Sequence, residues 1–362
     1  MKSLAIKVLS SEQNYNVYIG PGIRTKLPQF LAELAITKEM PLLLVSDSNV
    51  AELYLAEMMQ ILAEYNIYSY VLAAGEESKS LSELDRLTSY ALEQQLDRQT
   101  VVLALGGGVV GDFAGFFAAS YMRGVRYIQL PTTILAHDSS VGGKVAINHQ
   151  LGKNMLGAFH HPMAVIYDTK FLQTLPEQQI KSGLAELLKH GLIADCDFVL
   201  WLKQHAEQIL SLDNELLTDA LFRGIAIKLA IVSSDLIEKS VRAYLNYGHT
   251  LAHALETATN YRVLHGEAVA IGIRYSVEIA ASLGLVDDAV KEQTIELLRD
   301  YHLPTTIPSG LDSKAIFEIM QHDKKAQSGQ IRMVLPTGLG SVKLVTDIPD
   351  FLLREKINEL QR

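Results

Sequence analysis

The strongest constraint on the fold is an apolar run that ends in a glycine-rich turn and continues into a second apolar segment. Thr100–Leu105 has the length and the β-branched residues of a buried strand, Gly106–Gly111 follows it directly, and Asp112–Met122 is long enough for a helix. A strand, a glycine turn and a helix in this order form half of a βαβ unit. The pattern therefore predicts a parallel sheet covered by helices.

Strand-like and helix-like segments alternate through the first half of the chain, whereas the second half is helical in pattern almost to its end. This division predicts the α/β fold class, with an N-terminal Rossmann-like domain over residues 1–174 and a mostly α-helical domain over residues 175–362. The motifs described below assign nucleotide binding to the first domain and metal binding to the second. Gln327–Gln330 has the composition of a hairpin tip. The strand candidates are Val17–Ile19, Leu42–Val45, Ile67–Leu72, Val101–Leu105, Arg126–Gln129 and Ala164–Tyr167. The long helix candidates are Gln178–Ala194, Asp197–Leu210, Asn214–Glu238, Gly266–Leu283 and Asp287–Tyr301.

Four polar residues recur at helical spacing in the second half. Because they follow one another at intervals of four, three and four, they would share one face of a single helix, where a core normally has leucine or valine. An earlier segment places Glu186, Lys189 and His190 together on another helix face. The four residues are Arg242, Asn246, His249 and His253, and His265-Gly-Glu267 follows them.

A divalent metal site is the functional interpretation of these residues. Glu186, His249 and His265 form the two-histidine, one-carboxylate set that holds catalytic zinc and leaves coordination positions for water or substrate. The ordinary alternative, a hydrogen-bonded histidine without a metal, holds for most histidines taken singly. The neighbouring cationic and amide side chains favour the metal site, because they suit an anionic, hydroxylated substrate.

The glycine turn Gly106–Gly111 formally matches the G-x-G-x-x-G pattern of dinucleotide-binding proteins. Glycines let a pyrophosphate approach backbone N–H groups at a helix N-terminus. The acidic residue expected about 20 positions later is absent, because that region reads Gln129–Thr133. Asp47 and Asn49, which follow the strand Leu42–Val45, are better ribose candidates. The alternative is that these are ordinary strand-to-helix turns with capping side chains.

The densest polar stretch of the chain runs from Pro131 to Lys144 and resumes at Gly152–Asn154. Lys144 and Lys153 carry point charges suited to phosphate or carboxylate, although most surface lysines are only solvated. The flanking glycines favour the anion-binding interpretation.

Taken in order, these motifs resemble the 3-dehydroquinate synthase family of the sugar phosphate cyclases. The resemblance covers most of the chain, with one departure at Leu135–Asp138, where many family members have an additional residue before the aspartate. The motifs are Gly75-Glu-Glu-Ser-Lys-Ser80, Leu105-Gly-Gly-Gly-Val-Val-Gly-Asp112, Ser120-Tyr-Met-Arg-Gly124, Pro131-Thr-Thr133, Asp138-Ser-Ser-Val-Gly-Gly-Lys144, Gly152-Lys-Asn154, Leu184-Ala-Glu-Leu-Leu-Lys189, Asn246-Tyr-Gly-His249 and Leu264-His-Gly-Glu267.

The resemblance implies a site for each cofactor and for the substrate. Glu186, His249 and His265 would bind zinc or cobalt. NAD would be surrounded by Asp47, Asn49, Gly75, Glu76, Lys79, Gly108, Val109, Val110, Gly111, Asp112, Thr132, Thr133, Lys144, Lys153, Phe171, Leu172, Gln173 and Thr174. Catalysis and substrate binding would fall to Asp138, Lys144, Lys153, Asn154, Lys189, Arg242, Asn246 and His253. Arg123 would reach across the interface of a homodimer, and either Lys324 or Lys325 would close over the phosphate.

The resemblance also implies the chemistry, a carbon–oxygen lyase reaction of the shikimate pathway to chorismate and the aromatic amino acids. The substrate, 3-deoxy-D-arabino-heptulosonate 7-phosphate, would be oxidised at C5 with NAD⁺ as the hydride acceptor, and this oxidation acidifies the neighbouring C6 hydrogen. Phosphate then leaves, the hydride returns to C5, the ring opens, and an intramolecular aldol closure gives 3-dehydroquinate. NAD is therefore catalytic in this scheme and is not consumed.

Composition excludes several other classes of protein. The 362 residues suffice for two domains, and 48% hydrophobic residues are ordinary for a globular chain. A net charge of −9 argues against nucleic-acid binding, and no apolar run reaches the roughly 20 residues of a membrane span. Cys196 is the only cysteine, so no intramolecular disulfide is expected, and the first residues lack a secretory signal. We therefore expect a cytoplasmic protein.

Three alternatives stay open at the level of the sequence. A metal-dependent polyol or alcohol dehydrogenase has the same general architecture but does not require so many anion-binding residues. A related sugar-phosphate cyclase would make a cyclitol from a substrate without the carboxylate, and Arg242 with Asn246 favours the acid substrate. A non-catalytic nucleotide-binding protein would not need the metal ligands.

Overall fold

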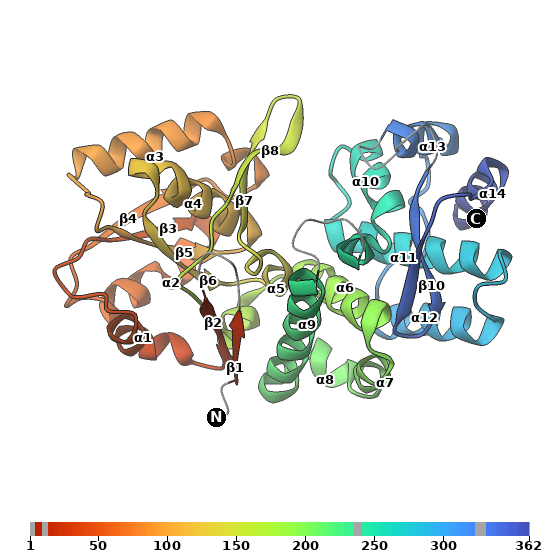
Figure 1. The fold of residues 1–362 in the computed structure, drawn as a ribbon, viewed down its shortest axis with the longest axis horizontal. Helices are drawn as coiled ribbons and strands as arrows, with labels where there is room; N and C mark the ends of the chain where they lie inside the picture. The colour runs from red at the N-terminus through yellow and green to blue at the C-terminus, as the bar shows by residue number, and fades with distance from the viewer. Residues whose placement is uncertain (1–3, 9–13, 235–240, 323–330, 362) are drawn as a thin grey trace. The chain divides into compact units, whose positions relative to one another are not determined.

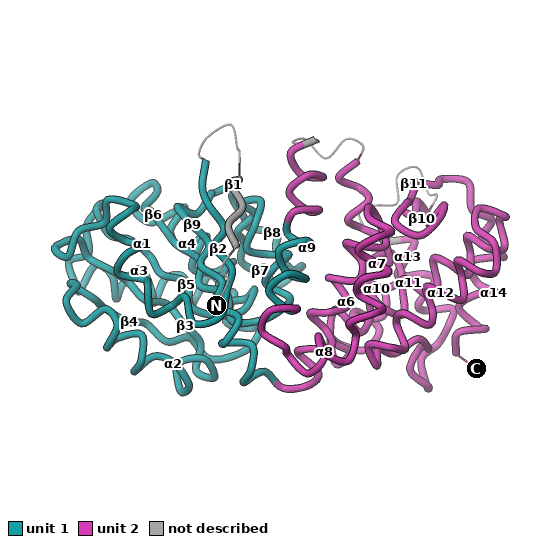
Figure 2. Tube along the Cα trace, turned by 90° about the horizontal axis from the view of Figure 1, so that it is seen from below, with its two compact units in different colours: residues 1–175, 217–225 teal, residues 176–216, 226–362 magenta. Residues whose placement is uncertain are grey.

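The structure is a computed structural model that describes residues 4–8, 14–234, 241–322 and 331–361 of the chain. It divides into two compact units, residues 1–175 with 217–225 (unit 1) and residues 176–216 with 226–362 (unit 2), which Figure 2 distinguishes by colour. Lys324, Lys325 and the hairpin tip expected at Gln327–Gln330 lie outside the described residues.

Unit 1 is built on a seven-stranded sheet with the order β1-β2-β9-β6-β5-β3-β4 (Figure 1). β1 is antiparallel to β2, and every other neighbouring pair is parallel. All the strand candidates lie within this sheet, so the predicted α/β fold class is confirmed. The strands are β1 (Leu4–Val8), β2 (Tyr15–Gly20), β3 (Leu42–Asp47), β4 (Ile67–Leu72), β5 (Val101–Gly106), β6 (Arg126–Pro131) and β9 (Ala164–Asp168).

Helices cover both faces of the sheet, because alternate residues of its central strands point to opposite faces and both sets are apolar. Leu43 and Val45 of β3 pack with α3 and α4, whereas Leu42 and Leu44 pack with α1 and α2. All four side chains are fully buried. The helices of unit 1 are η1 (Ile23–Lys26), α1 (Leu27–Glu33), α2 (Ser48–Ile61), η2 (Glu76–Ser78), α3 (Leu81–Glu93), α4 (Gly108–Ser120), η3 (Tyr121–Arg123), α5 (Ala136–Ser139) and η4 (Thr169–Thr174).

A β-hairpin that the sequence analysis did not predict packs against α4. Its strands, β7 (Lys144–His149) and β8 (Gly152–Phe159), pair antiparallel. Only Val145 and Ile147 of β7 enter the core, so the alternation that marks a half-buried strand extends over too few residues to be recognised in a polar stretch. The hairpin matters for function because it carries Lys144, Lys153 and Asn154.

Unit 2 is mostly helical, with one antiparallel hairpin, β10 and β11, that the sequence analysis also missed. The predicted helix Asp197–Leu210 is divided at His205, and residues 217–225 of α9 belong to unit 1. Within the described parts of the chain, no helix is both long and apolar enough to cross a membrane. The elements are α6 (Glu177–Ala194), α7 (Cys196–Gln204), α8 (Ala206–Leu210), α9 (Asn214–Ser234), η5 (Val241–Asn246), α10 (His249–Ala258), α11 (His265–Ser282), α12 (Asp288–Asp300), α13 (Ser313–His322), β10 (Met333–Gly338), β11 (Ser341–Val345) and α14 (Asp350–Leu360).

Two glycines let the backbone of α11 touch its neighbours directly. A Cβ atom on Gly266 would collide with the backbone carbonyl of Ser182 on α6, and one on Gly272 would collide with the carbonyl of Gly248 before α10. The backbone N–H of Gly266 also donates to the Ser182 hydroxyl at 3.0 Å. Helix α11 therefore packs so closely against α6 and the start of α10 that only glycine fits at these two positions.

We expect Gly266→Ala to destabilise unit 2 by about 1–3 kcal/mol, because the added methyl group forces α11 away from α6. The free energy of unfolding, measured by urea denaturation of metal-free protein, checks this. The matched control is Gly338→Ala, since a Cβ there meets nothing within 4 Å and should leave stability unchanged. Equal unfolding free energies for the two variants would show that the close helix contact is not required.

Candidate functional site

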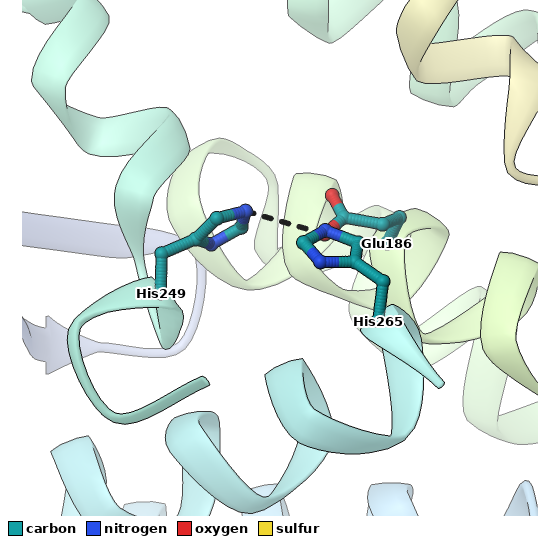
Figure 3. Close-up of side chains that lie close together, drawn as sticks. All are labelled: Glu186, His249 and His265. Carbon is teal, nitrogen blue, oxygen red and sulfur yellow. Dashed lines mark ion pairs between the residues drawn. The ribbon is translucent and has the colours of Figure 1, made fainter. Parts of the chain in front are cut away.

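The three predicted metal ligands come together within unit 2. Glu186 lies in the middle of α6, His249 is the first residue of α10, and His265 is the first residue of α11. Their side chains point toward one another from these three helices (Figure 3). One ligand atom from each residue lies within 4.8 Å of the other two, so a single cation would be within reach of all three.

The geometry of this cluster suits a divalent cation. The Nε2 atom of His249 lies 3.5 Å from Oε1 of Glu186, and Nε2 of His265 lies 3.3 Å from the same oxygen. The side chain of Glu186 is only 1% exposed, and Lys189 on the same helix forms an ion pair with it. A buried carboxylate with two imidazoles is a donor set that zinc and cobalt accept, and the residues present therefore fit the implied metal.

Both histidines direct their second ring nitrogen at an acceptor. Nδ1 of His249 lies 3.1 Å from the backbone carbonyl of Tyr247, and Nδ1 of His265 lies 3.3 Å from Oε1 of Glu256. Since a carbonyl and a carboxylate only accept hydrogen bonds, each Nδ1 carries the hydrogen and each Nε2 is turned toward Glu186. Metal-binding histidines commonly have this arrangement, in which an acceptor at one ring nitrogen orients the other nitrogen toward the metal.

The pKa values of the two histidines move in opposite directions. Burial, assisted by the nearby Lys189 ammonium, lowers the pKa of His249 well below its ordinary value of 6.5. Burial also acts to lower the pKa of His265, but the hydrogen bonds to Glu186 and Glu256 outweigh it and raise the pKa to about 10. Near neutral pH the metal-free chain therefore holds a neutral His249 and a protonated His265.

Metal binding should consequently release about one proton near pH 7, because His265 must lose its proton before its Nε2 can coordinate. Its folded-state pKa is raised, so the protonated form dominates below pH 10 and competes with the cation. Zinc affinity should then rise about tenfold per pH unit between roughly pH 6 and 8. Calorimetric titration in two buffers of different ionisation enthalpy measures the proton count. Zinc binding without proton release would contradict coordination by His265.

The stripe of four polar residues does not lie on one helix, so that expectation was wrong. Arg242 and Asn246 belong to the 3-10 helix η5, whereas His249 and His253 belong to α10. Gly248 separates the two elements with φ 80°, a left-handed conformation that changes the direction of the chain. The spacing of residues in the sequence does not reveal such a change of direction. His249 and His253 do share a helix, and their rings meet edge to face with 5.4 Å between centroids.

The predicted nucleotide residues of unit 1 gather at one edge of the sheet. β3, β4 and β5 are parallel neighbours, so the loops that follow Asp47, Leu72 and Gly106 leave the sheet at the same edge. The strand order reverses between β3 and β5, which is where open α/β sheets bind ligands. α4 begins at Gly108, and its first N–H groups have no acceptor within the helix. The loops that carry these residues therefore share one edge of the sheet, and their role in NAD binding stays a prediction.

Several of these residues also have structural roles. The Asp47 carboxylate accepts the backbone N–H groups of Asn49 and Val50 at 2.9 and 3.1 Å, which caps α2. Phe171 and Leu172 are buried in the core, at 1% and 0% exposure, as is Val110. Their side chains therefore serve packing, and a nucleotide could contact only their backbone.

A buried lysine connects the loop after β4 to the other anion-binding elements of unit 1. Lys79 is 3% exposed, and its Nζ lies 2.8 Å from Oδ2 of Asp112 on α4 and 2.6 Å from Oδ1 of Asn154 on β8. Asn148 on β7 donates to Glu76 at 2.8 Å and accepts from the backbone N–H of Asn154. Asn148 was not predicted from the sequence, because only the pairing of β7 with β8 places it beside the glycine-flanked motif.

The remaining predicted substrate residues belong to both units, with exposed cations in unit 1 and buried cations in unit 2. In unit 1, Lys144 and Lys153 are exposed on the hairpin, and Arg123 is exposed at the end of η3 with φ 72°. In unit 2, Arg242 is 6% exposed and Lys189 is 1% exposed, and Lys189 Nζ donates to the carbonyl of Leu245 at 2.9 Å. Arg242 and Lys189 are thus charged groups held inside the unit that contains the three predicted metal ligands.

Comparisons with known proteins give a consistent result. Two family models match, 3-dehydroquinate synthase N-terminal over residues 69–182 and 3-dehydroquinate synthase C-terminal over residues 183–326. The 3-dehydroquinate synthase of Geobacillus thermodenitrificans is 47% identical over 347 residues, which cover 95% of this chain and 94% of the relative.

Two solved structures of cyclases resemble the fold over nearly its whole length. 2-Deoxy-scyllo-inosose synthase, complexed with carbaglucose-6-phosphate, NAD⁺ and Co²⁺, has a TM-score of 0.88 at 27% identity and covers 98% of this chain and 100% of its own. ValA, a 2-epi-5-epi-valiolone synthase from Streptomyces hygroscopicus with NAD⁺ and Zn²⁺ bound, has a TM-score of 0.87 at 26% identity and covers 97% and 98%.

Proposed function

This chain belongs to the 3-dehydroquinate synthase family, and we propose that Glu186, His249 and His265 hold the divalent cation that the family's reaction requires. The enzyme is a lyase of the shikimate pathway that converts 3-deoxy-D-arabino-heptulosonate 7-phosphate into 3-dehydroquinate and inorganic phosphate. Its cofactors are NAD and zinc or cobalt. The observation that carries the metal assignment is the convergence of two imidazole nitrogens on a buried carboxylate.

The residues of unit 2 would prepare the site for an oxidation at C5 of the substrate. When bound, the cation supplies Lewis acidity toward substrate hydroxyls, and NAD⁺ supplies a reversible hydride acceptor. Glu186 neutralises part of the cation's charge and holds Lys189 beside it. Lys189 then keeps a positive charge where an alkoxide must develop. Arg242 offers a planar fork that suits the substrate carboxylate.

The residues of the β7–β8 hairpin would bind the substrate phosphate. Lys144 and Lys153 are exposed cations, and Asn154 is held in place by its contacts with Lys79 and Asn148. Cleavage of the C–O bond places additional negative charge on the departing phosphate oxygen, so fixed cations at this position would lower the barrier to elimination. Asp138, Asn246 and His253 complete the set that we assign to the substrate.

We further propose a homodimer in which Arg123 of the partner subunit contacts the phosphate. Support comes from the exposed position of Arg123 and from the left-handed backbone of Met122 and Arg123, φ 48° and 72°. Such a conformation costs energy, and strained residues cluster at functional sites. A cytoplasmic location is also proposed, and the single cysteine agrees with it.

Phosphate release from 3-deoxy-D-arabino-heptulosonate 7-phosphate tests the proposal. Protein with catalytic NAD⁺ should yield equal amounts of phosphate and 3-dehydroquinate, without net NADH. Chelation should stop the reaction, and zinc or cobalt should restore it. Turnover of sedoheptulose 7-phosphate in place of the acid would move the chain to the cyclitol-forming cyclases. Accumulation of NADH with a simple alcohol would indicate a dehydrogenase.

A further inference from the structure

The two ligand histidines are oriented by acceptors of different kinds. The acceptor for His249 is the backbone carbonyl of Tyr247, which comes with the left-handed turn at Gly248. The acceptor for His265 is the side chain of Glu256, nine residues earlier in the chain and on a different helix. Only the second acceptor depends on the identity of one side chain.

His265 is the ligand that most needs an anchor. Its side chain is 31% exposed, compared with 12% for His249 and 1% for Glu186. It is also the first residue of α11, so no preceding helical turn restricts its rotamer. Without a partner at Nδ1, the imidazole could turn its Nε2 away from Glu186.

Glu256 is well placed to supply that anchor. It lies two helical turns after His249 on α10, so one helix carries both a metal ligand and the acceptor for another. Its side chain is 14% exposed and forms an ion pair with His265 through the 3.3 Å contact to Nδ1. Low exposure strengthens the charge-assisted hydrogen bond relative to one in water.

We propose that Glu256 is a positioning residue that orients His265 for the divalent cation and increases the donor strength of its Nε2. This inference rests on the proposed metal site and extends it beyond the three ligands. Carboxylate–histidine–metal arrangements of this kind fix the tautomer of the ligand and make it more basic. Glu256 also adds a second carboxylate near the site, and its negative charge attracts a divalent cation.

The test measures metal affinity, without substrate or NAD, by competition between metal-free protein and a chromophoric chelator for Co²⁺. We expect Glu256→Ala to bind Co²⁺ about 10–100-fold more weakly than the parent, with a changed visible absorption spectrum. Glu256→Gln keeps an acceptor oxygen and loses the charge, so its affinity should lie between the two. It also carries the test if the alanine variant does not fold.

The matched control is Glu278→Gln on α11. Glu278 has a side-chain exposure of 18%, close to that of Glu256, but pairs with Arg274, 3.6 Å away, instead of a ligand. Its Co²⁺ affinity should equal that of the parent. This control separates the loss of a particular contact from the loss of any carboxylate in unit 2.

Two conclusions against the inference are possible, and the measurements distinguish them. If Glu256→Ala binds Co²⁺ within about twofold of the parent while His265→Ala loses binding, the metal site stands and Glu256 has no positioning role. A lower unfolding temperature of metal-free Glu256→Ala with unchanged affinity leads to the same conclusion. If neither variant changes the affinity, the metal assignment itself fails.

Discussion

His265→Ala should abolish metal binding and turnover together. The variant removes one of three ligands, so a cation that binds at all would be held by Glu186 and His249 alone. Lewis-acid stabilisation is worth several kcal/mol, and each factor of ten in rate corresponds to about 1.4 kcal/mol, so kcat/KM should fall by about 10³-fold or more. Metal content after dialysis and phosphate release from the sugar acid phosphate are the two measurements.

The control for this variant is His302→Asn. His302 is an exposed histidine of the same unit with φ 53°, and asparagine tolerates that left-handed conformation. The control should keep full metal content and activity. A His265→Ala protein that retained its metal and its activity would remove His265 from the ligand set.

Lys144→Ala should fold normally but release phosphate slowly. Lys144 is an exposed residue at the first position of β7, so its loss should change the free energy of unfolding by no more than about 0.5 kcal/mol. If its ammonium stabilises the departing phosphate, kcat/KM should fall by about 10²–10³-fold, as for other single donors at a developing charge. Thermal unfolding and steady-state phosphate release measure the two effects separately.

Lys26→Ala is the matched control, because Lys26 is an exposed lysine of η1 in the same unit and lies outside every site proposed for this chain. It should match the parent in both stability and rate. Phosphate release by Lys144→Ala at the parental rate would show that the anion-binding assignment of the hairpin is wrong.

The fold of unit 1 was largely predictable because its central strands are apolar on both faces. β3 and β5 read as continuous hydrophobic runs, and every side chain from Leu42 to Val45 is fully buried. The hairpin β7–β8 was missed for the opposite reason. In β8 most side chains are partly or fully exposed, so its residues carry no period-two apolar signal.

The convergence of Glu186, His249 and His265 was predicted correctly, but the path of the chain between them was not. Sequence spacing suggested one helix from Arg242 to His253, whereas Gly248 divides that segment into two elements. Glu256 was overlooked, although its spacing of seven from His249 places it on the same face of α10. A search for carboxylates at helical spacing from each ligand would have found it.

The kinds of side chain available and the order of helices and strands can be inferred from the sequence. The apolar runs and the glycine turn predict a parallel sheet that precedes a helical unit. The residue types predict an anion-binding edge for the sheet, and imidazole and carboxylate donors for the helical unit. These properties follow from local periodicity and from the chemistry of single side chains, which do not require knowledge of distant contacts.

The way in which Glu186, His249 and His265 meet depends instead on packing between residues far apart in the chain. The backbone contact of Gly266 with Ser182 brings the start of α11 against α6, and the contact of Gly272 with Gly248 brings α11 against the start of α10. The two contacts join residues that are 24 and 84 positions apart in the chain. No local sequence pattern shows which glycine packs against which carbonyl group. The physical reason is close packing, since helix separation is set by the atoms on both surfaces at once.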